Sequence, residues 1–477
     1  MKFSGDVKRD AAAVREKFGP SVDIIMREMT CSGRKVFAFM LDGMCDEIKI
    51  TEGIIKPVTD MVYENTALSF NDFITTVVFK SVNVRTADTV EKAASDIVSG
   101  NLLLIAQGET CALSFPVQGF PKRNPGEPQA EQNERGSQEA FTDNFKDNAT
   151  LLRRRLRTPD LVIEQLTTGS VSNTPVLLCY LSDRVSKEIL TQVRKRISEI
   201  KLDCVTGSGY IRPFLDSPRP SLFTDTGFTE RPDRFSSLLT EGRVGIIVDG
   251  SPFALIVPWL FIDYFHTVDD YLSSPYYALF MRILRITCFI IASTLPGTFV
   301  AVCLFHPEIM PADIMYGIAA ATGKTPFPIM IEALTIHFIY EIVREAGLRM
   351  PRSVGHAVSI VGALVIGDAA VTAGLIAAPM LIVVALTAIS SSVISRLHEP
   401  VAILRFAFII IGGFTGLYGV MLGAGIMIID ICSVSPYGVP FSAPLAPFIK
   451  KAQSDAILRK DHRKTQMGKF LTGRMKF

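Results

Sequence analysis

The residues of this chain with the greatest chemical potential are acids inside long apolar stretches. Val354–Ile394 contains a single charged side chain, Asp368, and Pro326–Glu345 carries three glutamates among aliphatic residues. Stretches of this length and apolarity predict helices that cross a membrane. A carboxylate is costly in hydrocarbon, so an acid at such a position marks a polar pathway or a paired site. These acids are therefore the first candidates for function.

Helical periodicity divides the polar residues of the second stretch between two faces. One stripe carries His337, Glu341, Arg344 and Glu345, and Glu332 lies on the opposite side. The stripe could face an aqueous pathway between helices or subunits. Alternatively, the helix lies flat at the membrane interface, or Glu341 pairs with nearby arginines. His337 and Glu341 are four residues apart, but no third ligand is in view, so we expect no metal site.

Asp368 is surrounded in sequence by small residues, which are Gly362, Gly367, Ala370, Ala373 and Gly374. Small residues along a helix permit close helix packing, which suits an oligomer arranged around an axis. A ring of carboxylates at such an axis would favour cations. Asp368 could also cap a helix at a break between a half-helix and a span. Both interpretations are compatible with each other.

The elements that must position these acids are the apolar stretches themselves. The pattern predicts four spans, at Ile286–Phe305, Pro326–Glu345, Ala369–Ile394 and Arg405–Ile429, with a re-entrant half-helix at Val354–Ile366. Arginines before the first span and a basic tail place both of these ends on the cytoplasmic side, which requires an even number of crossings. Five or six spans would follow if Gly412–Gly413 or Gly423 interrupts the last stretch.

The chain has 477 residues, and the part before these stretches has mixed composition and alternates strand-like and helix-like patterns. The predicted fold class is an α/β N-terminal region of two subdomains, followed by an all-α multi-spanning membrane domain. Pro252–Phe265 is apolar and aromatic but too short to span, so it predicts an interfacial collar. The predicted domains are 1–118 and 141–251 as α/β subdomains, 119–140 as a polar linker or loop, 252–282 as the collar, 283–449 as the membrane domain and 450–477 as a basic tail.

Composition and motifs argue against several other functions. The net charge of +2 gives no footprint for nucleic acid, and no GxxxxGK[ST] or GxGxxG motif is present. The eight cysteines form no CxxC pair, and no catalytic triad stands out among few histidines. We therefore expect no enzyme, cofactor or nucleic-acid partner. Met1–Glu16 is charged and lacks the apolar segment of a signal peptide, so we expect the N-terminal region to be cytoplasmic.

Several blocks of the sequence resemble the GerA family of spore germination proteins, and they follow one another in the family's order. The blocks are Thr229–Asp233, Gly242–Arg243 through Val248–Pro252, Pro326–Pro328 with Glu332, Glu341 with Arg344–Arg352, Ser359–Val371, Pro436–Pro440 and Ala443–Pro447. The resemblance runs from about Val22 to Phe448. Phe441 departs from the tyrosine that the family often carries there, and the tail after Phe448 has no counterpart in the pattern.

The resemblance implies the A-subunit type of a germinant receptor, a class that also includes the protein known as stage V AF. It implies a two-part cytosolic region, a multi-pass domain in the spore inner membrane and partners of the B and C types. It further implies a homo-oligomer that conducts cations during germination. The residues leave an alternative, a non-conducting scaffold whose basic Arg153–Arg157 cluster and proline-rich Arg212–Arg234 segment recruit partners. These two segments could equally be solvated faces with no docking role. A secondary transporter is less favoured because the membrane stretches show no internal repeat.

Overall fold

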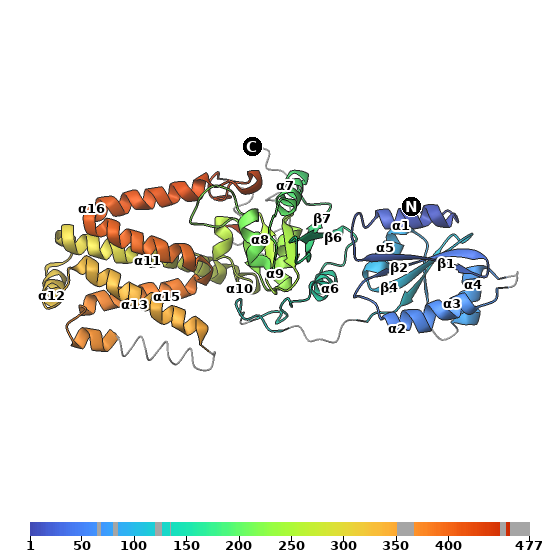
Figure 1. Cartoon of the computed structure of the whole chain (residues 1–477), viewed down its shortest axis with the longest axis horizontal. Helices are drawn as coiled ribbons and strands as arrows, with labels where there is room; N and C mark the ends of the chain where they lie inside the picture. The colour runs from blue at the N-terminus through green and yellow to red at the C-terminus, as the bar shows by residue number, and fades with distance from the viewer. Residues whose placement is uncertain are drawn as a thin grey trace.

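The computed structural model describes residues 1–63, 68–79, 84–119, 126–133, 135–350, 367–448 and 455–457. The molecule is elongated, with one α/β unit at the N-terminal end, a second in the middle and a bundle of helices at the far end (Figure 1). This arrangement agrees with the predicted class of an N-terminal α/β region followed by a helical region. Gly362, the half-helix at Val354–Ile366 and nearly all of the basic tail lie outside the described residues.

The first unit is an antiparallel sheet with helices packed against it. Within the described residues its strand order is β1-β2-β4-β5-β3. Strand β4 is buried along its whole length, and α5 packs an apolar face of Val90, Ala93, Ala94 and Ile97 next to it. The strands are β1 (Ile24–Cys31), β2 (Arg34–Leu41), β3 (Arg85–Ala87), β4 (Asn101–Ala106) and β5 (Ala112–Pro116). The helices are α1 (Val7–Glu16), α2 (Glu47–Ile50), η1 (Thr51–Ile55), α3 (Lys56–Asp60), α4 (Phe70–Phe73), η2 (Ile74–Val78) and α5 (Val90–Val98).

The second unit repeats the topology of the first. Its described strands have the order β6-β7-β9-β10-β8, which is the same order once each unit is numbered from its own first strand. In both units a helix precedes the first hairpin, and another precedes the last one. The strands are β6 (Leu161–Thr168), β7 (Thr174–Leu181), β8 (Gly227–Thr229), β9 (Val244–Val248) and β10 (Ala254–Val257). The helices are α6 (Phe145–Arg155), α7 (Lys187–Ser198), α8 (Ser208–Leu215) and α9 (Pro232–Thr240).

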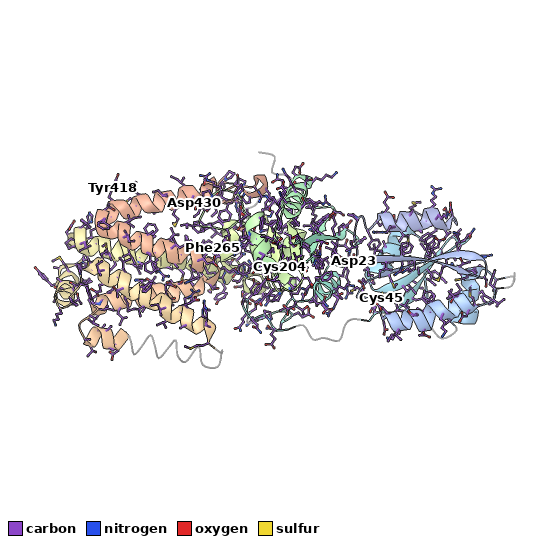
Figure 2. All side chains as sticks on the ribbon, in the orientation of Figure 1. Asp23, Cys45, Cys204, Phe265, Tyr418 and Asp430 are labelled. Carbon is purple, nitrogen blue, oxygen red and sulfur yellow. The ribbon has the colours of Figure 1, made fainter. Side chains whose placement is uncertain are left out.

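A buried ion pair joins the two units. Arg153 on α6 is 1% exposed and donates from Nε and Nη2 to the carboxylate of Asp23 at 2.6 and 2.9 Å. Nη2 also donates to Oγ of Ser21 at 2.9 Å. Asp23 lies where the first unit meets the second (Figure 2). The prediction that Arg153 belongs to a basic docking surface is therefore wrong, because its buried side chain connects the two units.

The two segments predicted to be loosely packed are anchored to the second unit. In the described part of the predicted linker, the backbone N–H groups of Ala130 and Glu131 donate to Oε1 of Glu230 at 2.5 and 2.7 Å. The predicted extended segment Arg212–Arg234 instead contains the end of α8, the whole of β8 and the start of α9. Its prolines suggested an open conformation, but Pro232 occupies the first turn of α9, where proline suits a helix.

The prediction of an interfacial collar at Pro252–Phe265 is wrong for most of that segment. Residues Ala254–Val257 form β10, which pairs with β9 and β8 in the sheet and is buried throughout. Trp259 is 1% exposed, and three arginines, Arg234, Arg243 and Arg396, lie over its ring. The aromatic residues fill a core instead of meeting lipid, and η3 (Phe261–Phe265) packs beneath the helical region.

The helical region begins at α10 (Asp269–Leu272) and α11 (Pro275–Phe305). It continues through η4 (Pro307–Ile309), α12 (Ala312–Thr322), α13 (Ile329–Arg349), α15 (Ala378–Val393), η5 (Ser395–Leu397), α16 (His398–Ser433) and η6 (Pro436–Gly438). By length and composition, α11 and the Ser395–Ser433 stretch are the two described helices that could cross a membrane, and α15 is shorter but apolar.

Two of the predicted spans are interrupted. The stretch Ala369–Ile394 is helical to residue 372 and breaks at Gly374, whose φ of +69° is a left-handed conformation that glycine adopts without strain. The last stretch breaks at Gly416, where φ is +66° and ψ is −156°. Figure 1 shows that the two halves of α16 fold back on each other. The break is at Gly416, not at the Gly412–Gly413 pair or Gly423 suggested by the sequence.

Candidate functional site

The acid with the most partners in the helical region is Glu341 on α13. Its Oε1 accepts from Nη1 of Arg405 at 3.0 Å, and its Oε2 lies 3.3 Å from Nε2 of His398. Nη1 of Arg344, one turn further along α13, is 3.8 Å from the same oxygen and also contacts His398. The carboxylate is therefore neutralised inside one chain, as in the alternative in which Glu341 pairs with arginine.

Two of these partners come from the first turns of α16. This helix begins with Glu399 and Pro400, an acid and a proline in the positions that favour a helix start. His398 is fixed by Ser391 of the preceding helix, whose hydroxyl is 3.2 Å from Nδ1. Arg405 lies two turns deeper, which is about 10 Å at 1.5 Å per residue. The start of α16 thus places two basic side chains, His398 and Arg405, against α13.

Arg405 connects three helices. Its side chain is 0% exposed, its Nε donates to the carbonyl of Ala292 on α11 at 3.2 Å, and its guanidinium lies over the ring of Tyr340. Among the described residues, Nη2 of Arg405 has no hydrogen-bond partner. A buried cation without its counterion is strongly destabilising, so Glu341 is the residue that permits Arg405 at this position.

Glu332 and His337 are also buried inside the bundle. Glu332 is 1% exposed, and its carboxylate accepts from the backbone N–H of Ala377 at 2.5 Å, at the N-terminus of α15. An acid at a helix N-terminus is favoured by the helix dipole. Nδ1 of His337 is 2.9 Å from the carbonyl of Ala333, while Nε2 has no partner among the described residues. Neither side chain is exposed on the surface of the single chain.

The remaining predicted residues lie on or near the surface of the chain. Asp368 is exposed in the short helix 367–372, and Glu345 is exposed and pairs with Arg349 at 2.7 Å. Of the predicted packing residues, Gly367 is buried against Leu381 of the same chain, Ala370 is half-buried and Ala373 is exposed. Gly374 ends the helix instead of lying within it.

The backbones of α11 and α16 pack closely at two glycines that were not among the predicted packing residues. A Cβ added to Gly412 on α16 would lie 2.3 Å from the carbonyl oxygen of Gly297 on α11. A Cβ added to Gly297 would lie 2.3 Å from the carbonyl oxygen of Phe408. Only glycine permits backbones to approach this closely. The signal in the sequence was a glycine in each of two facing apolar stretches.

Ion pairs gather at the base of the bundle, where it meets the second α/β unit. Asp270 accepts from Arg285 at 2.8 Å and lies 3.5 Å from Nε of Arg282, whose Nη2 is 3.1 Å from Asp455. Burial alone would raise the pKa of Asp270, but hydrogen bonds and the charge of Arg285 hold it below its usual range. Arg396, just before α16, pairs with Glu131 at 2.5 Å. Arg282 and Arg285 therefore have a structural role in addition to any role in topology.

The described residues contain no group of three or more His, Cys, Asp or Glu side chains that could hold a metal ion. The residues that sequence reasoning missed are Arg405 and His398. Arg405 was taken as the first residue of a span, yet apolar residues on both sides of it already placed a charge inside a buried helix. His398 follows no motif, and its role depends on the turn that brings α15 next to α16.

Comparisons with known proteins give a consistent result. The family model described as Bacillus/Clostridium GerA spore germination protein matches residues 12–468. Spore germination protein KA of Bacillus subtilis (strain 168) is 37% identical over 466 residues, covering 96% of this chain and 85% of the relative. Spore germination protein GerLA of Bacillus cereus is 29% identical over 463 residues, covering 96% and 94%. The N-terminal domain of the A subunit of the Bacillus megaterium spore germinant receptor GerK3 is 26% identical with a TM-score of 0.43, covering 55% of this chain and 98% of that one.

Proposed function

Since the chain belongs to the GerA family of spore germination proteins, we propose that it is the A-type subunit of a germinant receptor and that its helical region forms an oligomeric, cation-conducting pore. In this proposal the pore opens in response to a nutrient signal. The α/β units face the cytoplasm, the helices lie in the spore inner membrane, and B-type and C-type subunits complete the receptor.

The surface of the helical region supports a membrane location. Large apolar side chains are exposed on α11, α15 and both halves of α16, among them Ile290, Ile382, Ile389, Phe414 and Met421. The surface of a soluble protein rarely exposes so many large apolar side chains close together. We propose that α11, α13, α15 and each half of α16 lie in the bilayer. This arrangement is closer to the alternative of five or six spans, in which a glycine interrupts the last stretch, than to the four-span prediction.

The observation that carries the pore proposal is the contrast between Asp368 and Glu341. Glu341 is paired with cations of its own chain, whereas Asp368 is exposed on a helix next to apolar neighbours. An exposed carboxylate at membrane depth is tolerated where it faces water or a partner. Copies of the chain that meet at this face would place a ring of Asp368 side chains around an aqueous lumen, which favours cations.

The test is current recorded from the purified full-length chain in planar bilayers under a cation gradient. Asp368→Lys is expected to reverse or abolish cation selectivity without changing the oligomeric mass. Asp313→Lys is the matched control, because Asp313 is an exposed acid on a different helix, α12. If both variants conduct with the selectivity of the parent chain, Asp368 does not line the pore.

The alternative of a non-conducting scaffold has less support than the sequence suggested. Its predicted docking cluster includes Arg153, which is buried against Asp23, and Arg155, which pairs with Glu139 at 2.6 Å. An oligomer that never carries current, alone or with B-type and C-type subunits, would favour the scaffold.

A further inference from the structure

A cavity of about 510 Å³ lies between the two halves of α16. Leu404, Ala407 and Phe408 line it from the first half and Ile426 from the second, while residues 220–223 of the second α/β unit close its base. The volume falls within the range of about 300–1,000 Å³ that is typical of ligand sites. The lining is almost entirely apolar, so the ligand must present an apolar body.

The charged groups near this cavity gather at one end. Oδ2 of Asp430 accepts a hydrogen bond from Oγ of Ser221 at 2.8 Å. Nη1 of Arg219 donates to the carbonyl of Ser433 at 3.2 Å, three residues beyond Asp430 on the chain. Figure 2 shows Asp430 on the side of the α/β units and Tyr418 at the opposite end of the same helix. The cavity is therefore amphipathic along the helix, with the carboxylate of Asp430 in its wall at the base and the exposed guanidinium of Arg219 next to that end, one residue before the lining residue Pro220.

We propose that this cavity binds one bilayer phospholipid with an ammonium-bearing head group. An acyl chain lies between the halves of α16, the ammonium meets Asp430, and the phosphate meets Arg219. The proposal rests on the membrane location proposed above, which places the base of α16 at the level of the cytoplasmic head groups.

Shape and charge favour a lipid over a protein segment. A helix is about 10–12 Å across with its side chains, which is too wide for a cavity of this volume along its length. An acyl chain is thin, and the cavity wall includes Ile426, which is 67% exposed on the surface that would face lipid. A carboxylate and a guanidinium at the same end complement a zwitterionic head group better than an anionic one.

The experiment is native mass spectrometry of the full-length chain, released from nanodiscs that contain equal amounts of palmitoyl-oleoyl phosphatidylethanolamine and phosphatidylglycerol. We expect one phosphatidylethanolamine to remain per chain. Ala407→Phe, which fills the cavity, should lose it. Ile410→Phe is the matched control, because Ile410 is exposed on another face of the same half-helix and its variant should retain the lipid. Asp430→Lys should shift the preference towards phosphatidylglycerol.

Three results would overturn the proposal. They are retention by Ala407→Phe, retention of both lipids without preference by the parent chain, and an unchanged preference in Asp430→Lys. Ala407→Leu, a smaller filling, covers the case in which the phenylalanine variant does not fold, and it should weaken retention. A parent chain that conducts in bilayers but retains no lipid refutes the lipid site alone. A chain that fails to insert into the nanodiscs refutes both this site and the membrane function.

Discussion

The pair of the half-buried Glu341 with the buried Arg405 gives the sharpest prediction about stability. Glu341→Gln removes the counterion of a guanidinium that is 0% exposed and already has one nitrogen without a partner among the described residues. Loss of one partner of a buried ion pair costs about 3–5 kcal/mol, because the other charge stays buried. With about 1.4 kcal/mol for each factor of ten, the ratio of folded to unfolded protein falls by about a hundredfold or more.

Replacing both partners should restore much of this loss. The double variant Glu341→Leu with Arg405→Met removes both charges and keeps similar volumes, which is often neutral or stabilising for buried pairs. The coupling between the two positions in the free energy of unfolding should therefore be large, and it should be stabilising, whereas Glu341→Gln is destabilising. His398 and Arg344 would remain near a neutral side chain, so a full recovery requires that they reach solvent at the helix ends.

The assay is thermal unfolding of the full-length chain in detergent. The quantity measured is the fraction of protein that stays monodisperse as the temperature rises. Glu345→Gln is the matched control. Glu345 is a solvent-exposed glutamate one turn away, and exposed pairs of this kind contribute about 0–1 kcal/mol. Equal stability of Glu341→Gln and Glu345→Gln would refute the reasoning. The reasoning would also be refuted if the double variant were less stable than Glu341→Leu alone and Arg405→Met alone.

Three further predictions concern other contacts. Asp23→Asn leaves Arg153 buried without a full counterion, and hydrogen exchange should accelerate at the junction of the α/β units, consistent with a loss of about 3–5 kcal/mol. Gly412→Ala should block the packing of α11 on α16 and lower the melting temperature, whereas Gly425→Ala, which meets no atom within 4 Å, should not. Burial, together with the nearby Asp225, raises the pKa of Asp216 to about 7. This folded-state value is above the ordinary one, so stability should fall as pH rises from about 4 to about 7. Asp216→Asn should therefore stabilise the protein at pH 8 and have little effect at pH 4, as measured by melting temperature against pH.

The sequence predicted elements well where local pattern and tertiary environment agree. Val244–Val248 is a continuous apolar run, and it forms β9 with every residue buried. Lys187–Ile200 has helical periodicity, and α7 ends two residues earlier. The collar prediction for the segment around Trp259 was wrong, because an aromatic residue near an apolar run has the same sequence pattern in a core as at a membrane surface. The pairing of β10 with β8 distinguishes the two, and that pairing is a long-range contact, since Ala254 pairs with Thr229.

The candidate site was only partly accessible from sequence for a similar reason. The periodicity of α13 correctly put Glu341 and Arg344 on one side, but it contains no information about what faces them. Arg405, the partner of Glu341, lies 64 residues further along the chain than Glu341. The duplicated strand order of the two units also escaped detection, because equivalent strands share their order in the sheet rather than a short repeating motif.

The motif residues of the second α/β unit are mainly structural, and a short series of contacts links them to Glu341. Glu230 holds the backbone of Glu131, and the side chain of Glu131 pairs with Arg396. Two residues after Arg396, His398 contacts Glu341. The loop of the α/β unit and the centre of the helical region are therefore joined by a single turn at the start of α16. A displacement of that loop must change either the pair of Glu131 with Arg396 or the environment of Glu341, because the turn between them is too short to absorb the movement.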